Sequence, residues 1–250
     1  MKKIFLLLCL LCMAGQATAQ TLIDGIYYYL DSGSGTAQVT RGSSKYSGSI
    51  SIPENVTDGA TYSVTSIGYQ AFRDCTSLTS ITIPNSVTYI GHCAFQDCWG
   101  LTSITIPNSV TSLGEDCFWG CSGLTNIVVD AENTHYDSRN NCNAIIETSS
   151  NDLIACCMNT IIPNSVRSLR GNCFRGCTGL TSINIPNSVT SLGESCFCDC
   201  TGLTSITIPN SVTNIGGGAF YGCSGLTNLV VDAENTHYDS RNNCNAIIET

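Results

Sequence analysis

The sequence is short of charged residues, and of basic ones in particular. Asp, Glu, Lys and Arg make up 12% of the 250 residues, with 10 Lys and Arg against 19 Asp and Glu. The formal net charge of −9 disfavours binding to nucleic acid and to anionic membranes, because both attract basic surfaces. Ser, Thr, Asn and Gly are abundant instead. We therefore expect a polar but mostly neutral surface.

The sequence also lacks an apolar run that would cross a bilayer. The run from Ile4 to Met13 has ten residues, whereas a transmembrane helix needs about 20. Two lysines precede this run and Ala17-Thr18-Ala19 follows it, which is the order of a secretory signal peptide over residues 1–19. Cleavage there predicts a secreted or cell-surface protein with no membrane insertion. It also lowers the formal charge to −11, because Lys2 and Lys3 are removed.

Phenylalanine and proline are scarce, and each is confined to one register of a repeat. From Ile67 onward the sequence returns to the same pattern every 23 residues, and such self-similarity marks a repeat protein. All six prolines end a short β-branched run. One column of the repeat holds Phe72, Phe95, Phe118, Phe174, Phe197 and Phe220, and another holds Leu78, Leu101, Leu124, Leu180, Leu203 and Leu226.

The spacing within one unit predicts a short strand. Leu78, Ile81 and Ile83 are expected to point inward, while the residues between them face water. Pro84 ends the strand because proline cannot donate to a ladder, and the segment around Phe95 fits a short helical turn. One unit cannot bury a core alone. We therefore predict a β-rich solenoid of 23-residue repeats, with about eight parallel strands in one sheet and little regular helix.

Residues 20–66 lie before the regular repeats and are predicted to form an N-terminal cap and the first strand. Residues 23–30 and 36–40 alternate like the two strands of a β-hairpin. The first repeat strand at residues 50–53 is separated from residues 64–67 by an eight-residue insertion around Asp58-Gly59. The solenoid itself is expected to cover residues 67–250.

Two inserts interrupt the solenoid, at residues 130–162 and 232–250. They share the sequence from Asp130 to Thr148, so a 102-residue super-repeat overlies the shorter one. The second copy stops within its insert. We therefore predict that roughly the last 15 residues are loosely held. The open end around Leu226, Leu229 and Val231 is predicted to favour self-association or to belong to a longer native chain.

The segments IPNSVTSIG, AFxxC and LTSI, together with the NAIIET insert, resemble the BspA-like leucine-rich repeat proteins of bacterial surfaces. The resemblance extends from Asp24 to Thr250 and departs from the family pattern at Cys156, where glycine is expected. It implies a leucine-rich repeat fold. It also implies an adhesin that binds host-surface or extracellular matrix proteins, with no catalytic residues to carry over.

Seventeen cysteines, of which fifteen follow the signal peptide, raise the question of disulfides. Small buried apolar side chains account for two cysteine columns and for Cys157, which replaces a column leucine. Disulfides among the off-column cysteines are the alternative, since the compartment is oxidising. The columns hold Cys75, Cys98, Cys121, Cys177, Cys200 and Cys223, and Cys117, Cys173 and Cys196. The off-column cysteines are Cys93, Cys142, Cys156, Cys198 and Cys244.

Metal-binding and catalytic patterns are weak. Zinc sites use paired C-x2-C spacings, but the chain offers only Cys196-x-Cys198-x-Cys200. His135 and Asp137 form a His-x-Asp pair without a nucleophile at fixed spacing, so a surface loop is the favoured interpretation. The order of an EF-hand is missing around Asp130, Glu132, Asp137 and Asn140. We expect no metal, no cofactor and no enzymatic activity.

The candidate functional residues form faces rather than a cleft. The first is a set of Thr and Ser columns on the outer side of the strands, called here the hydroxyl face, because solenoids bind partners on such extended surfaces. The second is an aromatic patch on the turn side, beside Arg73 and His92. The hydroxyl face comprises Thr79, Ser80, Thr102, Ser103, Thr125, Thr181, Ser182, Thr204, Ser205 and Thr227, and the aromatic patch comprises Tyr69, Trp119 and Tyr221.

The predicted function is adhesion or protein–protein interaction at the cell surface. Two alternatives remain open. The chain is then either a structural spacer of a larger surface protein, or a glycan-binding module that uses the aromatic patch.

Overall fold

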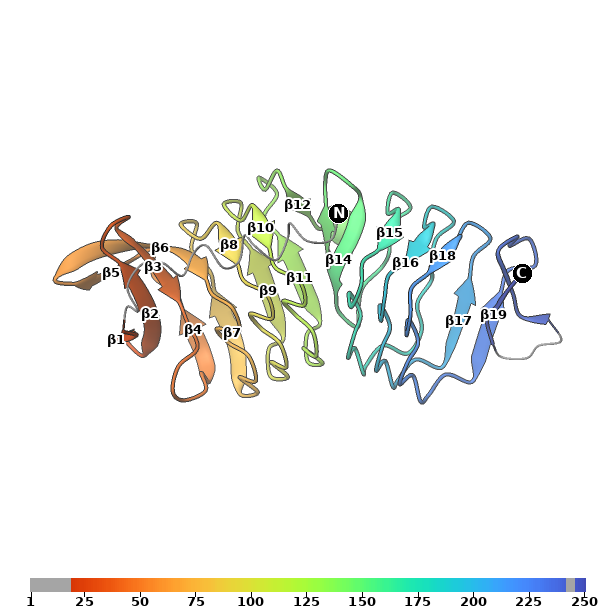
Figure 1. Cartoon of the computed structure of the whole chain (residues 1–250), viewed down its shortest axis with the longest axis horizontal. Helices are drawn as coiled ribbons and strands as arrows, with labels where there is room; N and C mark the ends of the chain where they lie inside the picture. The colour runs from red at the N-terminus through yellow and green to blue at the C-terminus, as the bar shows by residue number, and fades with distance from the viewer. Residues whose placement is uncertain (1–18, 242–245) are drawn as a thin grey trace, which may run out of the picture.

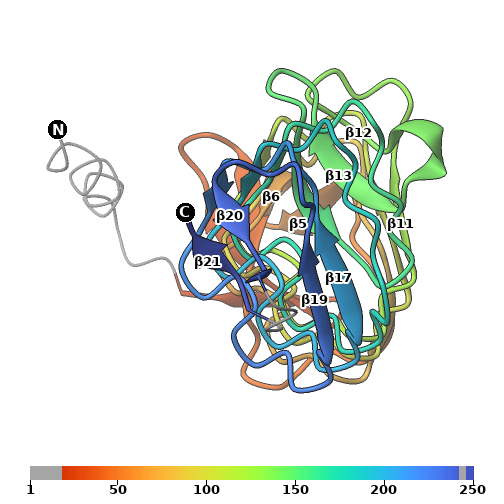
Figure 2. The same ribbon diagram turned by 90° about the vertical axis from the view of Figure 1, so that its right-hand side faces the viewer.

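The structure is a computed structural model that describes residues 19–241 and 246–250. Apart from Ala19, the predicted signal peptide lies outside the described residues. Strands stack side by side along the long axis of an elongated molecule, from β2 near one end to β19 near the other (Figure 1). Viewed along that axis, the coils overlie one another around one interior (Figure 2). The broad prediction of a repetitive, β-rich fold is confirmed.

Two parallel ladders run along the molecule, and their partners lie 23 residues apart in the sequence. Ser103 is opposite Asn126 in one ladder, and Ser168 is opposite Ser191 in the other. What is called here the long-strand ladder consists of three separate parallel pairs, β4 (Gly48–Ser51) with β7 (Leu78–Thr82), β9 (Ser103–Ile106) with β11 (Asn126–Val129), and β17 (Ser205–Ile208) with β19 (Asn228–Val231). The short-strand ladder contains β8 (Tyr89–Ile90), β10 (Ser112–Leu113), β15 (Ser168–Leu169), β16 (Ser191–Leu192) and β18 (Asn214–Ile215).

The prediction of one sheet of about eight strands is therefore wrong. The second ladder is built from two-residue strands, which are too short to show an alternating pattern. The predicted inward residues are nevertheless correct, because Leu78, Ile81 and Ile83 are all buried. In the short-strand ladder, Val87 and Ile90 are fully buried as well.

The segment around Phe95 is a series of turns and not a helical turn. Amide groups bond to carbonyls three residues earlier, as in Gln96 to Cys93 at 3.1 Å. Cys93 and Asp97 have φ of 54° and 58°, in the left-handed region that a right-handed helix excludes. The turn instead bonds to the next repeat, since the Phe95 N–H donates to the Cys117 carbonyl at 2.9 Å.

The phenylalanine column forms the predicted spine, in two separate stacks. Phe95 is fully buried, with its ring centroid 5.2 Å from that of Phe72 and 5.5 Å from that of Phe118. Phe174 and Phe197 form a second stack, with ring centroids 5.0 Å apart. The insert at residues 130–162 separates the two stacks, and the buried apolar residues likewise fall into two clusters.

The N-terminal region is a three-stranded meander of β1 (Thr21–Ile23), β2 (Ile26–Asp31) and β3 (Thr36–Val39). The predicted hairpin is thus present, but residues 23–30 are not one strand. Asp24 and Gly25 both have positive φ and make a two-residue turn, as Asp-Gly pairs favour.

The insertion around Asp58-Gly59 is also a hairpin, of β5 (Asn55–Asp58) and β6 (Ala60–Ile67). Residues 64–67 therefore belong to a strand rather than to a turn. Its partner β3 runs parallel to it.

The first insert folds into strands instead of the expected surface loop. It contains β12 (Tyr136–Asp137), a 3-10 helix η1 (Arg139–Asn141), β13 (Ala144–Glu147) and β14 (Asp152–Cys156), with the three strands antiparallel. Asn133 anchors its start, because the buried amide donates to the Pro107 and Val110 carbonyls at 2.8 and 3.0 Å. Both N–H groups of this side-chain amide thus donate to main-chain carbonyls inside the protein, which secondary-structure propensity alone does not predict.

The second insert begins in the same way. Asn235 makes the equivalent bonds to Pro209 and Val212, and β20 (Tyr238–Asp239) pairs with β21 (Ile248–Glu249). Residues 242–245 lie outside the described residues, so the predicted looseness of the last 15 residues stays a prediction.

Candidate functional site

The hydroxyl face lies on the outer side of the long-strand ladder. All ten of its predicted residues are at least partly exposed, whereas their strand neighbours Leu101, Ile104 and Ile106 are buried. The spacing of the buried residues produces this division, because two polar residues, such as Thr102 and Ser103, separate the first two buried positions of each unit. The ten residues are therefore accessible, on or beside the separate strand pairs β4-β7, β9-β11 and β17-β19, with Ser182 joined to Ser205 by an isolated bridge.

Hydrogen bonds between repeats hold the threonines of this face in place. Thr125 Oγ1 donates to the Thr102 carbonyl at 3.1 Å, and Thr204 Oγ1 donates to the Thr181 carbonyl at 3.2 Å. The hydroxyl proton of each is thus committed to the neighbouring repeat. Its lone pairs and methyl group remain for contact, on a surface that loses little conformational freedom when it binds.

Four exposed apolar residues on or beside this face were not predicted as functional, and one of them is Val230, which is 39% exposed. Val128 and Ile161 are 39% and 69% exposed, at the repeat position that Thr82 occupies in the first unit. Trp99 is 58% exposed and precedes Thr102 by three residues. The alternation of the strand signalled Val128 and Ile161, but only the Thr and Ser columns were considered. Trp99 stands alone at a position that usually holds Thr or Ser.

The aromatic patch is spread along the molecule. Tyr69 is 64% exposed and stacks on His92, with ring centroids 5.9 Å apart. The Arg175 guanidinium lies 3.9 Å from the centroid of the Trp119 ring. Tyr221 is 74% exposed. Among the described residues, no ring contact joins these three aromatics, which belong to the first, third and sixth repeats.

The cysteines of the described residues are free thiols, and all but the half-buried Cys223 are buried. Column thiols donate to the phenylalanine carbonyl of the preceding repeat, as in Cys98 to Phe72 and Cys121 to Phe95, both at 3.0 Å. Burial raises the pKa of Cys75 to about 11, so this thiol is neutral at pH 7. The off-column Cys93, Cys142, Cys156 and Cys198 are free as well, and Cys244 lies outside the described residues.

One group of side chains converges closely enough to hold a metal ion, within the ranges that the structure describes. Donor atoms of His92, Cys93 and Asp116 lie within 4.8 Å of one another, and these nitrogen, sulfur and oxygen donors suit zinc. Sequence spacing did not reveal this group, because Asp116 comes from the next repeat. Burial and the Asp116 carboxylate raise the pKa of Cys93, so metal binding would have to displace a proton.

The residues considered for calcium are engaged otherwise. Asp137 forms an ion pair with Arg139, and Asp130 accepts a hydrogen bond from the Glu132 amide. His135 is exposed beside Thr134, so the His-x-Asp pair serves the surface of the insert.

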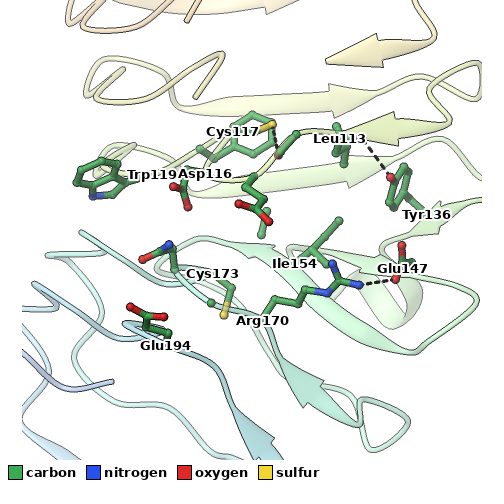
Figure 3. Close-up of a pocket in the computed structure, with 16 residues that line it drawn as sticks. Leu113, Asp116, Cys117, Trp119, Tyr136, Glu147, Ile154, Arg170, Cys173 and Glu194 are labelled. Carbon is green, nitrogen blue, oxygen red and sulfur yellow. Dashed lines mark hydrogen bonds and ion pairs between the residues drawn. The ribbon is translucent and has the colours of Figure 1, made fainter. Parts of the chain in front are cut away.

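A cavity of about 370 Å³ lies where the first insert separates the third repeat from the fourth. Asp116 and Cys117 line one wall, Cys173 and Glu194 line the opposite wall, and Ile154 lies between them (Figure 3). Sequence patterns do not reveal this cavity, because its walls are far apart in the chain and the 23-residue pattern does not pair them.

Within the described residues, no helix is long and apolar enough to cross a membrane.

Solved structures of bacterial leucine-rich repeat proteins are similar to this chain. A leucine rich cell surface protein from Faecalibacterium prausnitzii is 21% identical, with 93% of this chain and 98% of that chain covered and a TM-score of 0.44. The pneumococcal vaccine antigen PcpA is 15% identical over 88% and 83% of the two chains, with a TM-score of 0.48. A leucine-rich repeat protein from Bacteroides ovatus is 26% identical over 87% and 73%, with a TM-score of 0.39.

No curated protein sequence matches the chain significantly. The family model for the BspA type leucine rich repeat region matches six copies, over residues 48–150 and 154–249. These two segments cover most of the chain and include the hydroxyl face, the aromatic patch and both walls of the cavity. The chain therefore belongs to the family of BspA type leucine-rich repeat proteins.

Proposed function

We propose that this protein is a secreted or cell-surface solenoid of 23-residue leucine-rich repeats that mediates adhesion or protein–protein interaction. The observation that carries the proposal is the hydroxyl face, a set of exposed small polar side chains, several of which are fixed by hydrogen bonds to the main chain of the preceding repeat. Host-surface or extracellular matrix proteins are the proposed partners. Secretion is proposed from the signal-peptide pattern at residues 1–19.

The chemistry of the face suits a protein partner. Interfaces combine a polar rim with a few exposed apolar and aromatic anchors. Trp99 and Ile161 are such anchors at the edge and on the plane of this face, and both are more than half exposed. A purely structural spacer offers no role for them, so the binding proposal is preferred to the spacer.

The glycan-binding alternative has weaker support. Carbohydrate sites use aromatic rings gathered in one place, but Tyr69, Trp119 and Tyr221 belong to separate repeats. The Trp119 ring is also covered by Arg175. We propose no catalytic activity and no nucleic-acid partner, the latter because the net charge is −9.

Self-association through the last repeat remains part of the proposal. Leu226 is half-buried, whereas its column counterpart Leu124 is 1% exposed. Leu229 and Val231 are only 8% and 5% exposed, so Leu226 is the residue of the three through which copies would associate. Sedimentation velocity over a range of concentrations should show a dimer that Leu226→Lys abolishes.

A binding screen tests the function. The secreted protein is screened against matrix proteins and glycans, alongside a variant with Thr102, Thr181 and Thr204 changed to Glu. We expect a protein ligand that the variant fails to bind. The matched control places three glutamates on the other ladder, at Thr88, Thr111 and Thr190. These residues are exposed and donate to the preceding repeat in the same way.

Equal loss of binding in both variants would mean that added negative charge, and not this face, explains the effect. Glycan binding that survives both variants but is lost in Tyr221→Ala would favour the glycan alternative.

A further inference from the structure

The cavity between the third and fourth repeats interrupts a regular series of main-chain hydrogen bonds. At a regular step, three amides of one turn donate to three carbonyls of the next. Phe95 donates to Cys117 at 2.9 Å and Asp97 donates to Trp119 at 2.8 Å, and Phe174 donates to Cys196 at 2.9 Å in the second block. These bonds fix the distance between neighbouring turns.

At the cavity only one of the three bonds forms. The Gly120 amide donates to the Arg175 carbonyl at 3.3 Å. The other two donors of this step, the amides of Asp116 and Phe118, have no hydrogen-bond partner among the described residues, and neither do the carbonyls of Gly171 and Cys173 that would have accepted from them. All four residues line the cavity. Phe118 and Cys173 are buried, whereas Asp116 is half-buried and Gly171 is exposed. Buried main-chain groups are almost always paired, so the unpaired Phe118 amide and Cys173 carbonyl indicate a missing partner.

At two other places, side chains of the first insert supply hydrogen bonds that the next repeat would supply in a regular series, but at the cavity they do not. Tyr136 Oη accepts from the Leu113 amide at 3.1 Å, and Ser138 Oγ accepts from the Val129 amide at 3.0 Å. Both side chains thus stand in for carbonyls of the absent repeat, one in each ladder. No side chain does so for Asp116 or Phe118 among the described residues. The gap is therefore specific to the turn between the ladders.

The cavity has the shape of a wedge. Its two walls meet where Gly120 bonds to Arg175, and a Cβ added to Gly176 would lie only 3.0 Å from Gly120 Cα. Arg175 also covers Trp119 at this end. The walls separate toward Asp116, where Ile154 and Ala155 of β14 form a third side. A chain segment would thus enter from the open end.

The lining of the cavity is acidic. Glu115, Asp116, Glu147 and Glu194 contribute four carboxylates, against one guanidinium from Arg170. Arg170 is already paired with Glu147 at 2.9 Å (Figure 3). It is also paired with Asp152 at 3.1 Å. The carboxylates of Glu115, Asp116 and Glu194 have no ion pair or hydrogen bond within the described residues. An occupant with positive charge would be favoured.

We propose that this cavity binds an extended basic peptide segment of a partner protein, which supplies the missing main-chain hydrogen bonds. Its carbonyls accept from the amides of Asp116 and Phe118, and its amides donate to the carbonyls of Gly171 and Cys173. A Lys or Arg side chain of the segment lies against Glu115 and Glu194. The pairing is that of a peptide added to a sheet edge. The proposal rests on the proposed function in that the partner is a protein, but it uses a different site.

Fluorescein-labelled pentapeptides test this site on the full mature protein by fluorescence anisotropy. The probes are acetyl-Val-Lys-Val-Lys-Val-amide, the same peptide with Glu in place of Lys, and the lysine peptide with N-methylated central amides. We expect the lysine peptide to bind, the glutamate peptide not to bind, and N-methylation to weaken binding at least tenfold. Raising the salt concentration should weaken binding too.

Variants separate this site from the hydroxyl face. Glu115→Gln with Glu194→Gln should weaken the lysine peptide at least tenfold, and Ala155→Trp, which fills the cavity, should abolish its binding. The hydroxyl-face variant with three glutamates should bind the peptide as wild type does. Undiminished binding of the N-methylated peptide or by the Ala155→Trp variant would overturn the proposal. The absence of peptide binding by a protein that still captures a ligand on the hydroxyl face would overturn this inference and leave the proposed function intact.

Discussion

Removing one phenylalanine ring from the spine should cost an amount that depends on its neighbours. Phe95 is fully buried between Phe72 and Phe118, whereas Phe118 stacks on Phe95 alone and lines the cavity on its other side. Truncating a buried phenylalanine to alanine costs about 3–5 kcal/mol. One stacked pair of rings contributes about 0.5–1.5 kcal/mol. Phe95→Ala should therefore fall near the upper end of the range, and Phe118→Ala about 1 kcal/mol below it.

Urea unfolding followed by circular dichroism measures both differences, with Thr102→Ala as the control. Thr102 is exposed, so its truncation should change the free energy of unfolding by less than about 0.5 kcal/mol. The slopes against urea must agree among variants for the values to be compared, because repeat proteins can unfold in parts. Equal and small effects at all three positions would refute the assignment of the phenylalanine column to the spine. Equal large effects at the two phenylalanines would refute the break in the stack.

Three further predictions concern the glycines and cysteines between repeats. Gly114→Ala should destabilise the protein by about 1–3 kcal/mol in thermal or urea melts, because its Cβ would lie 2.3 Å from the His92 amide nitrogen, whereas Gly217→Ala meets open space and should be nearly neutral. Burial raises the pKa of the Cys75 thiol in the folded state to about 11. The contribution of this neutral thiol to folding stability is therefore complete below the unfolded-state pKa of about 8.5 and is lost as the pH rises toward 11. Wild type should lose stability above about pH 8.5 more steeply than Cys75→Ala. Cys117→Ala should melt close to wild type because alanine fills the same column in other repeats, and mass spectrometry without reductant should find the column cysteines as thiols; a regular disulfide between successive repeats would contradict this.

The periodic parts of this fold could be predicted from sequence because one physical requirement recurs in every repeat. The Phe and Leu columns repeat at 23 residues, and their burial follows from the need to cover one spine. The short-strand ladder could not be predicted, because two residues such as Tyr89 and Ile90 carry no alternation. The Asp24-Gly25 turn was available as a signal but was assigned to the interior of a strand.

The candidate sites also differ in whether they could be predicted from the sequence. The exposure of the hydroxyl-face residues follows from the spacing of the buried residues in each unit, whereas their role in binding stays a prediction. The group of His92, Cys93 and Asp116 combines side chains of two repeats, and the cavity lies between Asp116 and Gly171, which an insert separates in the sequence. Such juxtapositions depend on how the insert packs, through contacts like that of Tyr136 with Leu113, and the repeat pattern contains no information about them.

Footprinting of the bound complex tests most directly whether the hydroxyl face is the binding surface. Hydroxyl-radical oxidation, read by mass spectrometry, compares Trp99 beside this face with Tyr69 on the turn side, which are 58% and 64% exposed in the free protein. With a captured protein ligand present, we predict that oxidation of Trp99 falls severalfold while oxidation of Tyr69 is unchanged. Protection of Tyr69 with Trp99 still fully reactive would contradict the account, because the partner would then cover the turn side.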